Sequence, residues 1–281
     1  MNNKYKSILI VILFIIVIFS CIVDKTYAVV NDANRNFKRI TTDDGLSQIS
    51  VSTIIQDRKG YMWIGTGDGL NKYNGSKFQV YKYNHKENSI SGNSITDLKE
   101  DLDGNIWVGT TAGLSKINTI TDEITNYLPN ENGCNISHYR IRAIMVSKNG
   151  DILVGTNDGL NIYDRENDNF IRIYNSEDYN SSLSNQEVYS LTEDVYGNYW
   201  VGTRNGLNRI NNKTGVLERY FADEDDENSI SHNFIYSLHA DNLGYLWVGT
   251  YYGGLNKLNL ETGAIEKFMP GLDSGIPGSY I

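Results

Sequence analysis

Apolar and polar residues alternate with a period of two over short segments along most of the chain, which is typical of half-buried β-strands. In one stretch the pattern predicts four strands, at Ser94–Glu100, Ile106–Thr110, Leu114–Asn118 and Glu123–Tyr127. Segments like the fourth recur at Lys77–Tyr81, Phe170–Tyr174, Val216–Phe221 and Ile265–Met269. The 20 Tyr and 26 Gly agree with this, because aromatic residues favour strands and Gly supplies turns. The sequence therefore predicts an all-β chain.

The strands belong to a unit that repeats five times. A Gly-Thr step recurs every 44 to 47 residues, with Gly at positions 65, 109, 155, 202 and 249. Two residues before each Gly stands Trp63, Trp107, Leu153, Trp200 or Trp247, so all four tryptophans share one position. A Gly-Leu pair follows each step, and two apolar anchors five residues apart precede it, from Leu46 and Val51 to Ile230 and Ile235.

Four short antiparallel strands in a repeat of this length predict one blade of a β-propeller. We expect blades at about residues 46–81, 90–127, 136–174, 183–221 and 230–269, within a propeller region covering 37–281. A further anchor pair, Ile276 and Ile281, predicts that a sixth blade begins near residue 276, in an incomplete seven-bladed ring. We expect the tryptophans to fill the wedge between blades, and residues 37–40 to form the outer strand of the final blade.

The N-terminus is typical of an export signal. Lys4 and Lys6 precede the uncharged run Ile8–Val23, so residues 1–28 are interpreted as a signal peptide or a membrane-anchor helix. Cleavage is left open, and lipidation at Cys21 is the less favoured alternative. Cys21 and Cys134 cannot form a structural disulfide once the leader is removed or embedded.

Composition and charge exclude several functions. A net charge of −9 argues against a nucleic-acid partner. The four histidines, at positions 85, 138, 232 and 239, lack metal-ligand spacing, and no nucleophile motif is present, so we expect no metal, no cofactor and no catalytic residue. The acidic segment 101–105 faintly resembles a calcium loop, but a hairpin turn explains it better.

Candidate ligand-binding residues lie where the blades differ. In a blade whose first strand lines the central channel, the loop before that strand and the loop between the second and third strands share one face. On these loops we single out residues suited to a sugar ring or a carboxylated ligand, since aromatic faces supply contact area and Arg supplies directional donors. They are Tyr251, Tyr252, Arg204, His232, His138, Tyr139 and Arg140.

The repeat resembles the two-component regulator propeller repeat, whose signature is close to Asp-x-x-Gly-x-x-Trp-x-Gly-Thr-x-x-Gly-Leu. The matching segments begin at Asp57, Asp101, Asp194 and Asp241, whereas the third unit departs with Ser147 and Leu153. The resemblance implies an extracytoplasmic sensor propeller of a membrane receptor, anchored by a later helix and followed by a histidine kinase or a diguanylate cyclase. A homodimer of the full receptor is a further expectation.

The leading functional hypothesis is a non-enzymatic sensor that binds an extracellular small molecule or oligosaccharide. It would be exported and held at the cell membrane, or secreted if the leader is cleaved and no anchor follows. One alternative is a secreted propeller lyase or glycoside hydrolase, for which Glu187 and Asp68 are lone candidate carboxylates. A protein-binding scaffold is the other.

Overall fold

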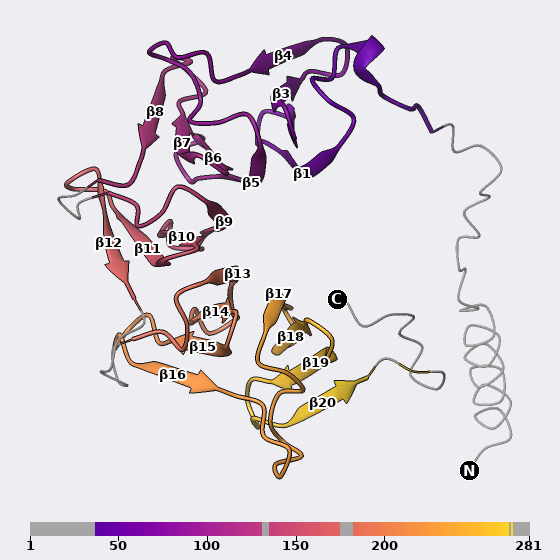
Figure 1. Ribbon diagram of the computed structural model, residues 1–281, viewed down its shortest axis with the longest axis vertical. Helices are drawn as coiled ribbons and strands as arrows, with labels where there is room; N and C mark the ends of the chain where they lie inside the picture. Colours follow the sequence, from indigo (N-terminus) through magenta and orange to yellow (C-terminus); the bar gives the residue numbers. More distant parts are fainter. Residues whose placement is uncertain (1–36, 131–134, 175–181, 270, 272–281) are drawn as a thin grey trace, which may run out of the picture. The chain divides into compact units, whose positions relative to one another are not determined.

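The computed structural model describes residues 37–130, 135–174, 182–269 and 271 (Figure 1). From Ile40 onward the described chain forms one compact unit of its own. A 3-10 turn, η2 (Thr42–Asp44), precedes the first strand, and every other regular element among the described residues is a β-strand.

The strands form five four-stranded antiparallel sheets, each built in chain order from its innermost to its outermost strand. Blade 1 contains β1 (Val51–Gln56), β2 (Met62–Thr66), β3 (Gly69–Tyr73) and β4 (Phe78–Tyr81). Blade 2 contains β5 (Ile95–Glu100), β6 (Ile106–Thr110), β7 (Gly113–Ile117) and β8 (Ile124–Tyr127). Blade 3 contains β9 (Ile141–Val146), β10 (Ile152–Thr156), β11 (Gly159–Asp164) and β12 (Asn169–Ile173). Blade 4 contains β13 (Val188–Glu193), β14 (Tyr199–Thr203), β15 (Gly206–Ile210) and β16 (Leu217–Tyr220). Blade 5 contains β17 (Ile235–Ala240), β18 (Tyr245–Thr250), β19 (Gly254–Asn259) and β20 (Ile265–Phe268).

The all-β prediction and the four-stranded blade are confirmed, with strand ends that differ by about one residue. The first strands of consecutive blades pack against one another, and they line a common inner side while the fourth strands lie outermost (Figure 1). Residues 37–40 have no regular structure, and Phe37 is 91% exposed. The blade that they are predicted to complete is not among the five described sheets, so their role as its outer strand stays a prediction. A strand needs a hydrogen-bonded neighbour, and no described strand pairs with them.

Three predictions concern residues outside the described part of the chain. They are the leader at residues 1–28, the disulfide argument on Cys21 and Cys134, and the start of the sixth blade near residue 276. Within the described residues, no helix has the length and apolar character needed to cross a membrane.

Trp63, Trp107 and Trp200 pack between blades, as predicted. Trp63, in blade 1, belongs to a buried cluster that includes Ile90, Ile95 and Leu98 of blade 2. Trp107 packs with blade 3 and Trp200 with blade 5 in the same way. Leu153 fills the equivalent place between blades 3 and 4. A large apolar side chain at this position therefore forms the contact between each blade and the next.

A carboxylate accepts a hydrogen bond from each of the four tryptophans, and it is buried in blades 1, 2 and 4. Asp57 Oδ2 accepts a hydrogen bond from Trp63 Nε1 at 2.8 Å, while Oδ1 accepts from the backbone N–H groups of Lys59 and Tyr61 at 3.0 and 2.9 Å. We call this arrangement the Asp–Trp clasp. It recurs in blades 2, 4 and 5, where Asp101, Asp194 and Asp241 accept from Trp107, Trp200 and Trp247. The clasp explains the spacing of six residues from Asp to Trp in the repeat.

Blade 3 replaces both halves of the clasp at once. Ser147 Oγ accepts from the backbone N–H of Asp151 at 2.9 Å, so a hydroxyl caps the turn where a carboxylate does so elsewhere. Leu153 has no N–H on its side chain and requires no buried acceptor. The departure of this unit from the repeat signature therefore leaves the blade fold intact.

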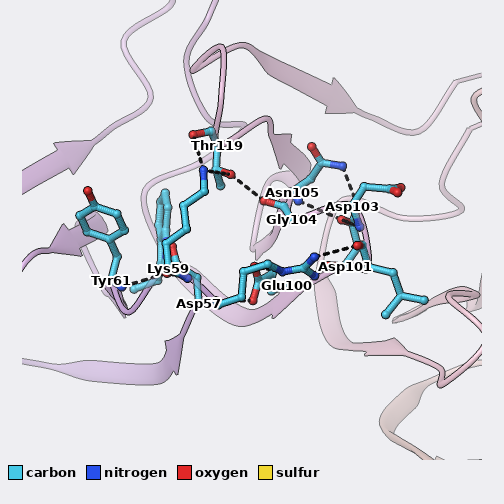
Figure 2. Close-up of polar contacts among 12 residues, drawn as sticks. Asp57, Lys59, Tyr61, Glu100, Asp101, Asp103, Gly104, Asn105 and Thr119 are labelled. Atoms are coloured by element: carbon cyan, nitrogen blue, oxygen red, sulfur yellow. Dashed lines mark hydrogen bonds and ion pairs between the residues drawn. The ribbon is translucent and has the colours of Figure 1, made fainter.

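Figure 2 shows the turns that carry the clasps in blades 1 and 2. Lys59 Nζ donates to Thr119 Oγ1 at 3.3 Å, and Thr119 Oγ1 donates to the carbonyl of Gly104 at 2.8 Å. Asp101 accepts from the backbone N–H groups of Asp103 and Asn105, both at 2.9 Å. Protein donors thus occupy this carboxylate, which favours the turn interpretation of residues 101–105 over a calcium loop.

The Gly of each Gly-Thr step makes room for the next blade. A Cβ at Gly155 would lie 2.5 Å from Val188 Cγ1, and one at Gly109 would lie 2.8 Å from Ile141 Cγ2. In both cases the neighbour is the second anchor of the following blade. A side chain, rather than backbone, therefore makes the close approach that this Gly allows.

A second recurring network joins the loop before each first strand to the sheet. In blade 1, Ser47 N–H donates to Asn71 Oδ1, Asn71 Nδ2 donates to Ser47 Oγ, and Ser47 Oγ lies 2.8 Å from Thr66 Oγ1. We call this the Ser–Thr–Asn latch. It recurs in blades 3, 4 and 5 around Asn161, Asn208 and Asn256, and Ser115 replaces the Asn in blade 2. The latch places this loop and the loop between the second and third strands on the same face, as predicted.

Candidate functional site: the inner rim of blades 3 to 5

A β-bulge interrupts the pairing of the first two strands in every blade, directly after the second anchor. Bulges of this kind redirect a side chain. The bulge residue is small in the first two blades, where it is Ser52 or Thr96, and large in the next three. There it is Arg142, Tyr189 or Tyr236. The bulges thus place bulky side chains at the inner rim of blades 3 to 5 only.

Five aromatic rings form a continuous cluster at this rim. Tyr189 contacts Phe234 with ring centroids 4.7 Å apart, and Phe234 stacks on Tyr251 at 5.0 Å. Tyr251 meets Tyr252 edge to face at 4.4 Å, and Tyr236 lies 6.1 Å from Tyr189. Tyr236 and Tyr252 are exposed. The cluster therefore presents ring surface to solvent across blades 4 and 5.

Charged side chains continue the rim from Tyr189 toward blade 3. Arg204 Nη1 donates to Glu187 Oε1 at 2.7 Å, and the Tyr189 hydroxyl donates to Glu187 Oε2 at 3.2 Å. The Arg142 guanidinium lies over the Tyr189 ring at 4.1 Å from the centroid, with Nη2 4.0 Å from Glu187 Oε2. The hydrogen bond from Arg204 holds the pKa of Glu187 below its usual range, and burial raises the pKa of Tyr189. Two guanidinium groups thus share one carboxylate beside the rings.

Tyr252 has a strained backbone. Its φ is 71°, in the left-handed region that residues other than glycine rarely adopt. The conformation arises because blade 5 has one extra residue between its Gly-Thr step and its Gly-Leu pair. An exposed aromatic residue held there at a cost of about 1 kcal/mol is a feature that occurs often at binding sites.

These residues are suited to hold a ligand with a ring face and acceptor oxygens. The rings offer stacking surface, Arg204 and Arg142 offer fixed N–H donors, and Glu187 offers acceptor oxygens. The group therefore combines stacking surface, fixed donors and acceptor oxygens in one place. Among the described residues no cluster of His, Cys, Asp or Glu could hold a metal ion.

The structure brings together three of the seven residues singled out from the sequence. Tyr251, Tyr252 and Arg204 all belong to the rim. His138 and His232 instead cap their own loops, since Nδ1 of each accepts from the backbone N–H two residues later, at 2.9 and 3.0 Å.

The last two of the seven, Tyr139 and Arg140, are consecutive residues in the loop before β9. Tyr139 lines a separate hollow over blade 2, which is described below. Arg140 is exposed, two residues before Arg142. The seven residues therefore do not form one patch.

Sequence reasoning missed Arg142, Tyr189, Phe234 and Tyr236 and treated Glu187 only as a lone carboxylate. The missing signal is positional: these residues immediately precede or follow the second anchor of their blades. At the same positions blades 1 and 2 have Ser50, Ser52, Ser94 and Thr96. Tabulating the repeat column by column would have revealed the change.

The family model for the two-component regulator propeller matches residues 45–68, 89–112, 182–205 and 229–252. These four segments are similar to the two-component regulator propeller repeat. Each contains the loop before the first strand, the clasp and the Gly-Thr step of one blade. The unmatched unit is blade 3, in which Ser147 and Leu153 replace the clasp, although its sheet is complete.

Similarity to a curated protein is confined to a short segment. A segment of 78 residues is 44% identical to "Histidine kinase P4" of Formosa agariphila. This segment makes up 28% of this chain and 6% of that protein. The chain thus corresponds to a small part of that relative.

Solved structures share the fold. The extracellular domain of a protein described as a hybrid two-component system, from B. thetaiotaomicron, aligns with a TM-score of 0.69 and 24% identity. The alignment covers 82% of this chain and 31% of that one. PorZ, a surface component of the type-IX secretion system of Porphyromonas gingivalis, aligns with a TM-score of 0.57 and 17% identity over 78% of this chain and 34% of its own. The chain therefore spans about a third of the length of these propeller proteins.

Proposed function

We propose that this chain is the extracytoplasmic sensing propeller of a membrane-bound two-component receptor, and that it binds a small molecule or oligosaccharide at the inner rim of blades 3 to 5. The observation that carries the proposal is the break in repeat symmetry there. The scaffold contacts recur from blade to blade, whereas the rim gains aromatic and ion-paired residues on three consecutive blades. Loops on a rigid scaffold are the usual place for recognition.

Export and membrane attachment are part of the same proposal. They are supported by the apolar run Ile8–Val23 and by the family of the repeats. Alkaline phosphatase fused after Ile281 should be active in intact bacteria and inactive when residues 1–28 are deleted. An inactive fusion to the full chain would contradict export.

The proposal also includes further blades of the same receptor, beyond the five described ones. Val51 and Ile54, on the side of blade 1 that blade 5 does not cover, are exposed, while the equivalent Ile95 and Leu98 of blade 2 are buried against blade 1. Trp247, at the far side of blade 5, is only half-buried. Additional blades packed on these two faces would bury this apolar surface.

The two carboxylates that suggested an enzyme do not have the surroundings that a glycosidase acid needs. Glu187 has a lowered pKa because Arg204 donates to it, whereas a general acid needs a raised one. Asp68 forms an ion pair of 2.6 Å with Lys82 in blade 1, three blades from Glu187 along the chain. Neither residue has the environment of a glycosidase acid.

The binding proposal is tested by titration calorimetry with neutral and acidic hexasaccharides, using maltohexaose, xylohexaose and hexagalacturonate. Each bound sugar is then tested with Arg204→Gln and Tyr252→Asn, which should weaken its affinity about tenfold or more. The matched control is Arg165→Gln. Arg165 is also exposed and forms a similar ion pair, 2.6 Å from Asp103, at the opposite end of the sheets.

The possible results separate the hypotheses. Binding without release of shorter sugars, lost in the rim variants and kept in the control, supports the sensor. Release of products would support the enzyme instead. Binding that the rim variants leave unchanged would show that the rim is not the site.

A further inference from the structure

A second concave surface lies over blade 2, on the same face as the rim. It is a hollow of about 610 Å³, which we call the blade 2 hollow. Tyr83, from the segment after β4, and Tyr139, from the loop before β9, line it together with Leu128, from the segment after β8. Three consecutive blades thus contribute to its wall.

The floor of the hollow depends on two small residues. Gly92 and Ala112 stand where the other blades have Gln48 and Asp68, His138 and Asp158, Asn185 and Asn205, or His232 and Tyr252. They are packed closely: a Cβ at Gly92 would lie 2.8 Å from Ala112 Cβ and 2.9 Å from Thr110 Oγ1. Of the five blades, only blade 2 lacks a side chain longer than a methyl group at both positions.

The lining of the hollow is uncharged and rich in hydroxyl and amide groups. None of its lining residues has an ionisable acid or base other than the tyrosine phenols. The Tyr83 and Tyr139 side chains are 44% and 52% exposed, and their hydroxyls make no hydrogen bond within the described part of the chain. Asn93 Oδ1 accepts from the Tyr83 backbone N–H at 2.7 Å, which leaves the Asn93 amide N–H groups as donors. The Tyr83 ring packs on His85, with centroids 4.6 Å apart.

The equivalent hollow over blade 5 shows that this neutrality is a property of blade 2. There the volume is about 450 Å³, and the lining includes Asp223, Glu224, Glu227, His232 and Lys267. Strand pairing makes Lys267 the counterpart of Asn126, because they face Asn256 and Ser115 on the preceding strands. One architectural position therefore carries charge in blade 5 and none in blade 2.

We infer that the blade 2 hollow is a binding site for an uncharged sugar, of about the size of a disaccharide. Tyrosine rings pack against the C–H face of a pyranose, and the phenol, amide and hydroxyl groups of the lining match its hydroxyls. A charged sugar would lose hydration without meeting an opposite charge. This site goes beyond the rim proposed above, since it would bind whether or not the rim does.

The test uses maltose, cellobiose, xylobiose and laminaribiose as probes and digalacturonate as the charged counterpart, with affinities from titration calorimetry on the full chain. Ala112→Trp fills the hollow from an exposed turn position, and Asp68→Trp places the same side chain at the equivalent turn of blade 1. At least one neutral disaccharide should bind in preference to digalacturonate. Its affinity should fall at least tenfold in Ala112→Trp and Tyr139→Ala and stay unchanged in Asp68→Trp.

Several outcomes would overturn the inference. They are the absence of binding by all four neutral disaccharides at millimolar concentration, stronger binding of digalacturonate, and equal affinity in Ala112→Trp and the unaltered chain. Arg204→Gln separates this result from the rim proposal. A loss confined to Arg204→Gln supports the rim and refutes the hollow. A loss confined to Ala112→Trp supports the hollow and leaves the rim to its own test with hexasaccharides.

Discussion

Removing the clasp of blade 1 one half at a time, and then both halves together, tests how the Asp and Trp positions depend on each other. Trp63 is fully buried, and Asp57 Oδ2 accepts from its Nε1 at 2.8 Å. Trp63→Leu keeps part of the apolar contact with blade 2 and should cost about 2 kcal/mol in packing. It also removes a hydrogen bond to a charged acceptor, worth about 1.5 to 3 kcal/mol. The single variant should therefore lose about 3 to 5 kcal/mol of unfolding free energy.

The second single variant, Asp57→Ser, should cost about 1 to 3 kcal/mol, because the buried indole N–H is left without its acceptor. The double variant reproduces blade 3, where a Ser hydroxyl caps the turn and a Leu fills the interface. Removing both partners of a buried hydrogen bond costs much less than removing one. We therefore expect the double variant to be more stable than the sum of the two single losses by about 1 to 2 kcal/mol.

The assay is urea unfolding followed by tryptophan fluorescence and by circular dichroism, with the slope of the transition compared across all four proteins. The cycle Asp194→Ser with Trp200→Leu in blade 4 provides a second, independent measurement. Additive losses within 0.5 kcal/mol in both cycles would refute the coupling. The positions would then contribute separately, and the clasp would not explain why blade 3 changes both.

Three further predictions concern packing, pH and backbone strain. Gly155→Ala should lower the free energy of urea unfolding by about 1 to 3 kcal/mol, because the new Cβ lies 2.5 Å from Val188 Cγ1. Adding Val188→Ala should recover part of this loss. No recovery would argue against the contact. Burial raises the pKa of Asp168, but hydrogen bonds from Tyr127 and Tyr163 outweigh it and hold the pKa below its usual range. The stability that Asp168 contributes should therefore be complete above its ordinary pKa of about 3.9 and lost as the pH falls through the lower folded pKa. Asp168→Asn should be less stable than the unaltered chain at pH 7, and the difference in stability should narrow below pH 4. A difference that does not depend on pH would contradict this. Tyr252→Asn should leave the melting temperature equal or slightly higher, since Asn tolerates a φ of 71° better than Tyr, and a clear drop would show that the ring stabilises the fold.

The fold could be predicted because it depends on signals that lie within each repeat. Strand periodicity, the Gly-Thr step and the recurring Trp were enough to place four strands in each of five blades. The outer strand predicted at residues 37–40 stays untested, because its partner blade is not among the five described sheets. A strand near a chain terminus is defined by its neighbour rather than by its own residues, and no described strand pairs with it.

The candidate site was only partly predictable because side-chain direction at a bulge cannot be read from alternation. Arg142 and Tyr189 each stand at a bulge position that pairs with no residue on the next strand. The alternation of period two therefore does not predict which face of the sheet their side chains lie on. The roles of His138 and His232 could not be predicted from the sequence for a different reason. A ring nitrogen that accepts a backbone N–H does what Gln48 and Asn185 do at the same place, and the sequence alone does not distinguish this from a ligand contact.

The Ser–Thr–Asn latch has a consequence for how such a protein can acquire new ligands. In blade 4 it fixes both loops of the binding face through a backbone N–H and three buried side chains, none of which is a rim residue. The three residues that follow the latch Ser are therefore free to change without altering the path of the chain. Each blade thus behaves as an independent cassette, with a constant frame and a short variable insert. A new specificity could arise by exchanging inserts on two or three neighbouring blades while the rest of the propeller stays as it is.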